Sequence, residues 1–89
     1  AETHQRLAIG YLCDQRLWGD AVGAFLKAKP SVQMGIYDYL LKQLIRVEKW
    51  DDAKAISIGF LDNMQKRGDA DSGQADVAKF YLSHLMTRG

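Results

Sequence analysis

Arg16-Leu17-Trp18-Gly19-Asp20-Ala21 is echoed 32 positions later by Glu48-Lys49-Trp50-Asp51-Asp52-Ala53. Both copies place tryptophan, an acidic residue and alanine in the same order and at the same spacing. A repeat of this length is typical of stacked helical hairpins, in which each hairpin buries its apolar face against the next. The repeat therefore predicts an all-helical fold that presents a binding surface rather than a catalytic pocket.

The first copy predicts a helical hairpin over residues 3–29. Thr3 is a candidate N-cap for a first arm that ends near Gln15, and its apolar residues recur at intervals of three and four: Leu7, Ala8, Tyr11 and Leu12. Asp20 is the N-cap candidate of the second arm, which should stop at Pro30 and whose apolar face comprises Ala21, Ala24, Phe25 and Ala28.

The second copy predicts another hairpin over residues 31–67. Ser31 is the cap candidate for its first arm, which ends near Val47 and whose apolar stripe consists of Tyr37, Leu40, Leu41 and Leu44. Trp50 opens the second arm and Gly68 closes it as a C-cap, with Ala53, Ile56, Phe60 and Met64 on one face.

A linker over residues 67–73 leads to a last helix over residues 74–87. Shifting the first arm of the second hairpin by 41 positions superimposes its apolar stripe on Ala78, Tyr81, Leu82 and Leu85, so this helix is either a half-repeat or a capping helix. No alternating apolar run indicates a strand. We expect one all-α domain over residues 1–89, with antiparallel hairpins stacked as a short right-handed α-solenoid of about five helices.

Composition narrows the kinds of partner and compartment. Twelve basic and eleven acidic residues leave a net charge of +1, which favours neither nucleic acid nor an anionic membrane. Cys13 is the single cysteine, so no internal disulfide forms and we expect a reducing intracellular compartment, either cytoplasm or an organelle matrix. No apolar run is long enough to span a membrane. Repeat arrays are rarely this short, so we expect a piece of a longer protein.

The repeat resembles the tetratricopeptide family, in which an aromatic residue in the turn accompanies an alanine on the second arm, as Trp18 and Ala21 do here. The first copy departs from that pattern at Arg16, where the family usually has glycine. The resemblance implies that first arms line a concave groove that holds a peptide. The groove residues it implies are Arg6, Asp14, Asp38, Lys42 and Arg46. Three of these are basic, so we expect an acidic or helical protein partner.

Two alternatives stay open. Residues 36–41 and 63–68 also resemble the opening and closing phrases of a pentatricopeptide repeat, a family that reads single-stranded RNA. In that interpretation Gln5 and Asp38 occupy the base-reading places, although two units with a net charge of +1 make a poor RNA tract. The other alternative is an assembly segment of a larger trafficking or coat-type α-solenoid, which has no free ligand.

Catalytic and metal-binding patterns are absent from the sequence. His4 and His84 lie near opposite ends without a carboxylate or cysteine at metal-ligand spacing, and no histidine stands in local register with Cys13. We therefore expect no enzyme, no metal and no cofactor. A further contact is expected on the last helix, where an exposed apolar face would meet a second copy, more of a parent chain or a foreign helix through Tyr81, Leu82 and Leu85.

Overall fold

The computed structural model describes residues 2–68 and 73–88, and these form five α-helices without a strand. The helices are α1 (Glu2–Asp14), α2 (Trp18–Lys27), α3 (Pro30–Arg46), α4 (Trp50–Arg67) and α5 (Gly73–Arg88). The expected all-α class is confirmed. Part of the predicted linker, residues 69–72, lies outside the described residues.

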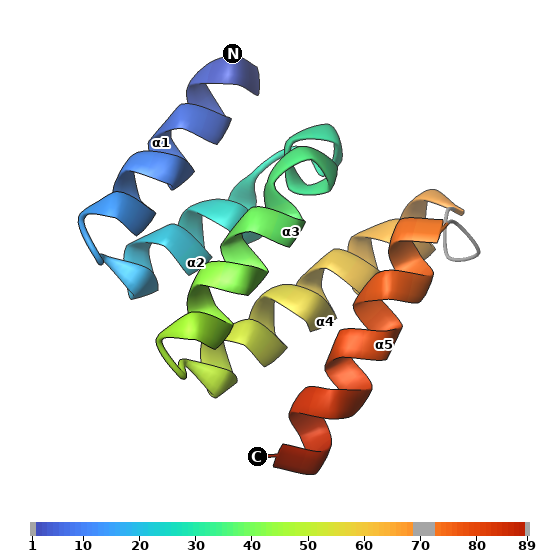
Figure 1. Cartoon of the computed structure of the whole chain (residues 1–89). Coiled ribbons are helices and arrows are strands. Elements are labelled where there is room, and N and C mark those ends of the chain that lie inside the picture. Colours follow the sequence, from blue (N-terminus) through green and yellow to red (C-terminus); the bar gives the residue numbers. More distant parts are fainter. Residues whose placement is uncertain (1, 69–72, 89) are drawn as a thin grey trace.

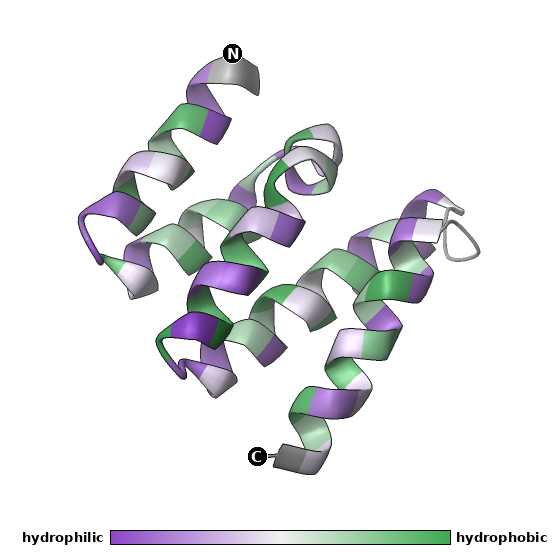
Figure 2. Cartoon of the chain, in the orientation of Figure 1, coloured by the Kyte–Doolittle hydropathy of each residue, from purple (hydrophilic) through white to green (hydrophobic). Residues whose placement is uncertain are grey.

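Successive helices run in opposite directions, so α1, α3 and α5 point one way and α2 and α4 the other (Figure 1). α1 packs against both α2 and α3, while α4 packs against α2, α3 and α5. Apolar residues line the sides on which these helices meet, and further apolar residues lie along α5 (Figure 2). The stack therefore has two layers: α1 and α3 form one, and α2 and α4 form the other.

The two turns of the repeated motif have the same backbone structure. Arg16 and Glu48, 32 positions apart, both adopt left-handed backbone conformations with φ of 60°. The N–H of Leu17 donates to the carbonyl of Leu12 at 2.9 Å, and the N–H of Lys49 donates to that of Leu44 at 2.8 Å. This pattern is the Schellman motif, which satisfies the last carbonyls of a helix. The sequence repeat is thus also a repeat of hydrogen bonding.

The predicted N-caps are wrong for the first three helices. α1 already includes Thr3, α2 begins two residues before Asp20, and α3 begins at Pro30, one residue before Ser31. The residues that precede α2 and α3 make no side-chain capping hydrogen bond. Proline suits the first helical position because its missing N–H would have had no partner there. Pro30 therefore starts α3 rather than only ending α2.

The core joins the two hairpins through three aromatic rings. Phe25 of α2, Tyr37 of α3 and Phe60 of α4 are all buried. Tyr37 stacks on Phe60 with ring centroids 4.5 Å apart, and Phe25 lies 6.2 and 6.3 Å from these two rings. The hydroxyls of Tyr37 and Ser57 share a buried hydrogen bond of 2.7 Å. Ser57 thus satisfies the one polar atom that the stacked tyrosine brings into the core.

A second buried polar contact ties α2, α3 and α4 together. Gln33 is fully buried, and its Nε2 donates to the carbonyl of Phe25 at 2.9 Å. Its Oε1 accepts a hydrogen bond of 2.8 Å from Nδ2 of Asn63. Because a buried amide without partners would destabilise the fold, this pairing fixes where α3 starts relative to its neighbours.

The alanines of the repeated motif lie where the arms of each hairpin come closest. Ala21 and Ala53 are fully buried, which agrees with their small size. Trp18 and Trp50 pack against the core but are only partly buried. Gly68 ends α4 with φ of 79°, as its predicted C-cap role requires. None of the helices in residues 2–68 and 73–88 is long and apolar enough to cross a membrane.

Candidate partner-binding groove

The predicted groove residues lie on α1 and α3, but their charges largely offset one another. Asp38 and Lys42 form an ion pair of 2.9 Å, one helical turn apart on α3. Their side chains are 62% exposed, so water screens the pair strongly. The hydrogen bond from Lys42 to Asp38 raises the pKa of the lysine. Asp38 therefore offsets the charge of Lys42, and any preference for an acidic peptide depends mainly on Arg6 and Arg46.

Arg6 and Arg46 lie at different places on the α1–α3 surface. The guanidinium of Arg6 lies over Gly35, where an added Cβ would be 3.2 Å from its Nη1 atom. Near the other end of α3, partial burial and the carboxylate of Asp14 raise the pKa of Tyr39, and the charge of Arg46 acts in the opposite direction. The structure thus brings Asp14, Tyr39 and Arg46 together but does not form a continuous basic strip.

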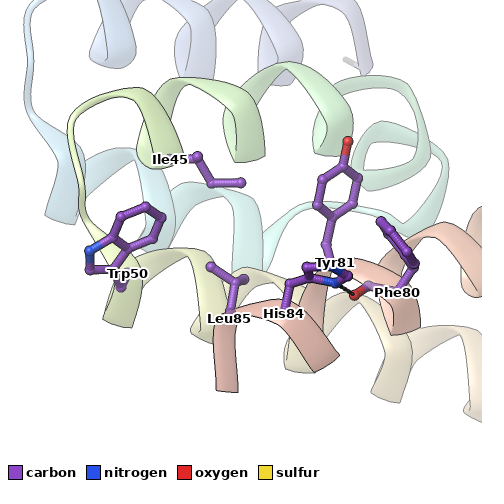
Figure 3. A pocket seen from close by; sticks show the side chains of 6 residues that line it. All are labelled: Ile45, Trp50, Phe80, Tyr81, His84 and Leu85. Carbon is purple, nitrogen blue, oxygen red and sulfur yellow. Dashed lines mark hydrogen bonds between the residues drawn. The ribbon is translucent and has the colours of Figure 1, made fainter. Parts of the chain in front are cut away.

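An apolar pocket opens between the C-terminal halves of α3 and α5. It has a volume of about 200 Å³, and Figure 3 shows side chains from three helices around it. Its lining residues are Ile45, Trp50, Phe80, Tyr81, His84 and Leu85. The imidazole of His84 lies at the edge of this pocket on α5 (Figure 3). An apolar floor with one polar edge suits a protein side chain better than a charged small molecule.

The edge of the pocket on α5 is aromatic. The ring of Phe80 lies 4.5 Å from that of His84 and 5.8 Å from that of Tyr81. Nδ1 of His84 lies 3.1 Å from the carbonyl of Phe80, within hydrogen-bonding distance. Although it contacts both rings, Phe80 is 60% exposed. A large apolar side chain is therefore presented to solvent at the edge of an apolar pocket.

A second hollow of about 220 Å³ lies between the same two helices, lined by Tyr37, Asp38, Gln74 and Val77. Tyr81 lines the first pocket, and its side chain extends toward α3 (Figure 3). We call the two hollows together the α3–α5 groove. The two hollows lie along residues 37–45 of α3 and 74–85 of α5, so an extended or helical segment that reaches both fits them better than a compact ligand.

At the α1–α3 boundary, the equivalent position is buried. Cys13 and Ile45 are 32 positions apart and occupy the same place in the repeat. Cys13 is 5% exposed where α3 packs on α1, whereas Ile45 is only partly buried and lines the open pocket. The difference arises because α5 packs chiefly on α4 rather than on α3. The groove is therefore a specific departure from the repeat at its C-terminal end.

The expected contact residues on α5 need correction. Leu85 is 3% exposed and belongs to the core, so it is wrong as an exposed contact, while Tyr81 and Leu82 are half-buried. The most exposed apolar residues of the helix are instead Phe80 and Met86, at 60% and 66%. The inward face is defined by alanines, Ala75 and Ala78, because α5 lies close against α4. The sequence pattern placed Leu85 on the exposed face of the helix, although this residue packs in the core.

Cys13 is a buried free thiol. Burial, and secondarily the charge of Asp14, raises the pKa of the Cys13 thiol, which favours the unreactive protonated form. Within residues 2–68 and 73–88, no group of three His, Cys, Asp or Glu side chains could hold a metal ion.

No protein-family model, curated protein or solved structure matches the chain. Function is accordingly inferred from the groove and the surfaces around it.

Proposed function

We propose that this chain is a non-catalytic interaction module that holds a helical segment of a partner protein in the α3–α5 groove. The observation that carries the proposal is an apolar pocket at the α3–α5 boundary, where Ile45 is only partly buried while its repeat equivalent Cys13 is buried at the α1–α3 boundary. A partner helix that inserts apolar residues would cover Ile45 and Phe80 and remove them from water. Its recognition would follow the i, i+3, i+4 and i+7 pattern of an amphipathic helix.

The two hairpins are, in this proposal, degenerate tetratricopeptide-like repeats. The shared turn structure at Arg16 and Glu48 and the buried Ala21 and Ala53 support that assignment. A buried single cysteine, Cys13, is consistent with a reducing compartment. The exposed cations Arg6 and Arg46 on the α1–α3 surface favour acidic residues in the part of the partner that extends beyond the groove.

Selection of helical peptides tests the proposal directly. A displayed library with randomised apolar positions at helical spacing would be selected on the folded chain, and binders would then be measured against Phe80→Ser and Ile45→Ser variants. We expect both substitutions to weaken binding at least about tenfold, since each removes a desolvated apolar contact worth more than about 1.4 kcal/mol. An Ile58→Ser variant is the matched control, because Ile58 is 55% exposed on α4 and does not line the groove.

A reporter within the groove gives an independent measurement. Trp50 lines the pocket, so in a Trp18→Phe background its fluorescence reports occupancy. Selected peptides should change this emission with the same affinity that binding assays give. Peptides that bind equally well to the Phe80→Ser and Ile58→Ser variants, and leave Trp50 emission unchanged, would refute the groove as the binding site.

The RNA alternative is tested in the same preparation. Random-sequence single-stranded RNA at physiological salt should bind no more tightly than the nonspecific range of about 10⁻⁴ to 10⁻⁶ M, given the net charge of +1. Sequence-selective binding well below that range would favour the pentatricopeptide interpretation instead.

A further inference from the structure

The two hollows of the α3–α5 groove differ in their chemistry. The first, the pocket near the C-terminal ends of α3 and α5, is lined by apolar and aromatic side chains and one imidazole. The second lies nearer the N-terminal ends of these helices, and Asp38 and Gln74 line it together with Tyr37 and Val77. A segment that fills both hollows must therefore offer an apolar group to the first and a polar group to the second.

The polar atoms of the second hollow favour a hydrogen-bond donor. Oδ2 of Asp38 pairs with Nζ of Lys42 at 2.9 Å, and Nε2 of Gln74 donates to the carbonyl of Met34 at 3.0 Å. The other oxygens of these two side chains, Oδ1 of Asp38 and Oε1 of Gln74, can only accept hydrogen bonds. An apolar side chain placed over them would remove the carboxylate from water without supplying a donor, which would weaken binding. A lysine or arginine supplies both donors and the opposite charge.

The distance between the hollows corresponds to two turns of a helix. On α3, Asp38 precedes Ile45 by seven residues, or about 10.5 Å at about 1.5 Å per residue. On α5, Gln74 likewise precedes Tyr81 by seven residues. Side chains at positions i and i+7 of a partner helix have the same rise, and they lie on one face because seven residues make almost two turns. One helix can therefore present one side chain to each hollow.

α4 already shows how a helix packs across α3 and α5. It contacts both of them and runs in the opposite direction (Figure 1). A partner helix with this antiparallel direction meets the apolar pocket first and Asp38 two turns later. A cation at the later position lies toward the C-terminal end of the partner helix, where the helix dipole favours it. We propose that the partner helix, whose binding here rests on the proposed function, carries a large apolar residue and, seven positions later, a lysine or arginine that pairs with Asp38.

Lys42 competes with the incoming cation for Asp38. Both side chains of the existing ion pair are 62% exposed, so water weakens their attraction. A partner helix that covers the groove excludes part of this water and strengthens the new pair. Removing the charge of Lys42 should therefore increase the affinity for a basic helix.

Helical peptides selected on the folded chain are the probe. A displayed library of helices several turns long would be randomised at every position, and we expect lysine or arginine to be enriched seven positions after the apolar anchor. In the tightest binder, replacing this cation with glutamine should weaken binding about three- to tenfold. With the Asp38→Asn variant, the same replacement should change the affinity by less than about twofold.

Asp62 and Lys66 provide matched controls. They form a similarly exposed i, i+4 ion pair of 3.0 Å on α4, and they line neither hollow. Asp62→Asn should therefore preserve the preference for the cation. Lys42→Gln should tighten binding of the basic peptide about twofold or more, whereas Lys66→Gln should leave it unchanged, which separates local pairing from net charge. Circular dichroism checks that every variant folds.

Binders that need Phe80 but show no enrichment of basic residues would overturn this inference and leave the proposed function standing. A preference for the cation that survives Asp38→Asn, or a cation enriched seven positions before the apolar anchor, would have the same effect. Selection that yields no binder weakened by Phe80→Ser would overturn the proposed function, and this inference with it.

Discussion

Arg16 and Glu48 adopt a backbone conformation that glycine would adopt without strain. In an L-residue with φ of 60°, the Cβ crowds the following carbonyl, which costs about 1 to 2 kcal/mol. Both side chains are exposed, so neither recovers that cost by burial. The turn forms nonetheless, because the Schellman hydrogen bonds and the packing of the two arms determine its shape.

Replacing Glu48 with glycine should therefore stabilise the domain. We expect a gain of about 0.5 to 1 kcal/mol in the free energy of unfolding, after the greater entropy of glycine in the unfolded chain offsets part of the relieved strain. Urea denaturation of the Glu48→Gly and Arg16→Gly variants measures it. Gly68→Ala is the reverse control: an added Cβ meets no neighbour there, so its expected loss of about 1 kcal/mol would come from φ of 79° alone.

Tyr37 should make the fold sensitive to alkaline pH. Burial raises its pKa to about 12, and the hydrogen bond to Ser57 offsets only part of that effect. The unfolded chain releases the phenolic proton near pH 10, whereas the folded chain keeps it until about pH 12. The stabilisation is therefore complete below about pH 10 and declines as the pH rises through this window, by roughly 2 to 3 kcal/mol in all.

A Tyr37→Phe variant isolates this contribution. Its free energy of unfolding should depend less on pH between about 10 and 12 than that of the parent chain, because phenylalanine has no proton to release. Chemical denaturation at several pH values measures the difference. Equal slopes for the two proteins would show that Tyr37 does not titrate on unfolding.

At the scale of the helix, the alanines of the repeated motif set how closely two arms approach. Ala53 is fully buried on α4 and has its counterpart in Ala21 on α2. An Ala53→Leu substitution should destabilise the domain by about 1 to 3 kcal/mol through overpacking. Ala8→Leu on the exposed side of α1 is the control and should change stability by less than about 0.5 kcal/mol. Thermal melting followed by circular dichroism distinguishes the two.

α5 shows where sequence patterning fails at this scale. The sequence predicts an exposed apolar face through Tyr81, Leu82 and Leu85, yet Leu85 is 3% exposed and the other two are half-buried. The buried face consists of Ala75, Ala78 and Leu85. The small residues face inward because α5 lies close against α4. The hydrophobicity of the sequence does not determine the distance between these two helices. In α3 and α4, the apolar residues of the predicted stripes face inward, whereas in α1 three of the four predicted residues, Leu7, Ala8 and Tyr11, are exposed.

For the whole molecule, the motif that repeats in sequence predicts the helices well and the groove poorly. The number of helices and the equivalence of Trp18 with Trp50 follow from local spacing. The α3–α5 groove depends on how far α5 lies from α3, which is a property of packing between distant residues. Asp38 and Lys42 are one helical turn apart, so their ion pair can be predicted from the sequence. Because this pair offsets the charge of Lys42, it argues against a basic strip.

The three-ring contact of Phe25, Tyr37 and Phe60 has a consequence for synthesis of the chain. Its members come from three successive helices, and the last follows the first by 35 residues. The first hairpin leaves the ribosome before the ring of Phe60 is available, so the side of Phe25 that meets Phe60 stays exposed until α4 emerges. Because chains emerge from the N-terminus at about 5 to 20 residues per second, this exposure lasts for seconds. We expect the nascent chain to bind chaperones that recognise exposed aromatic residues during that time.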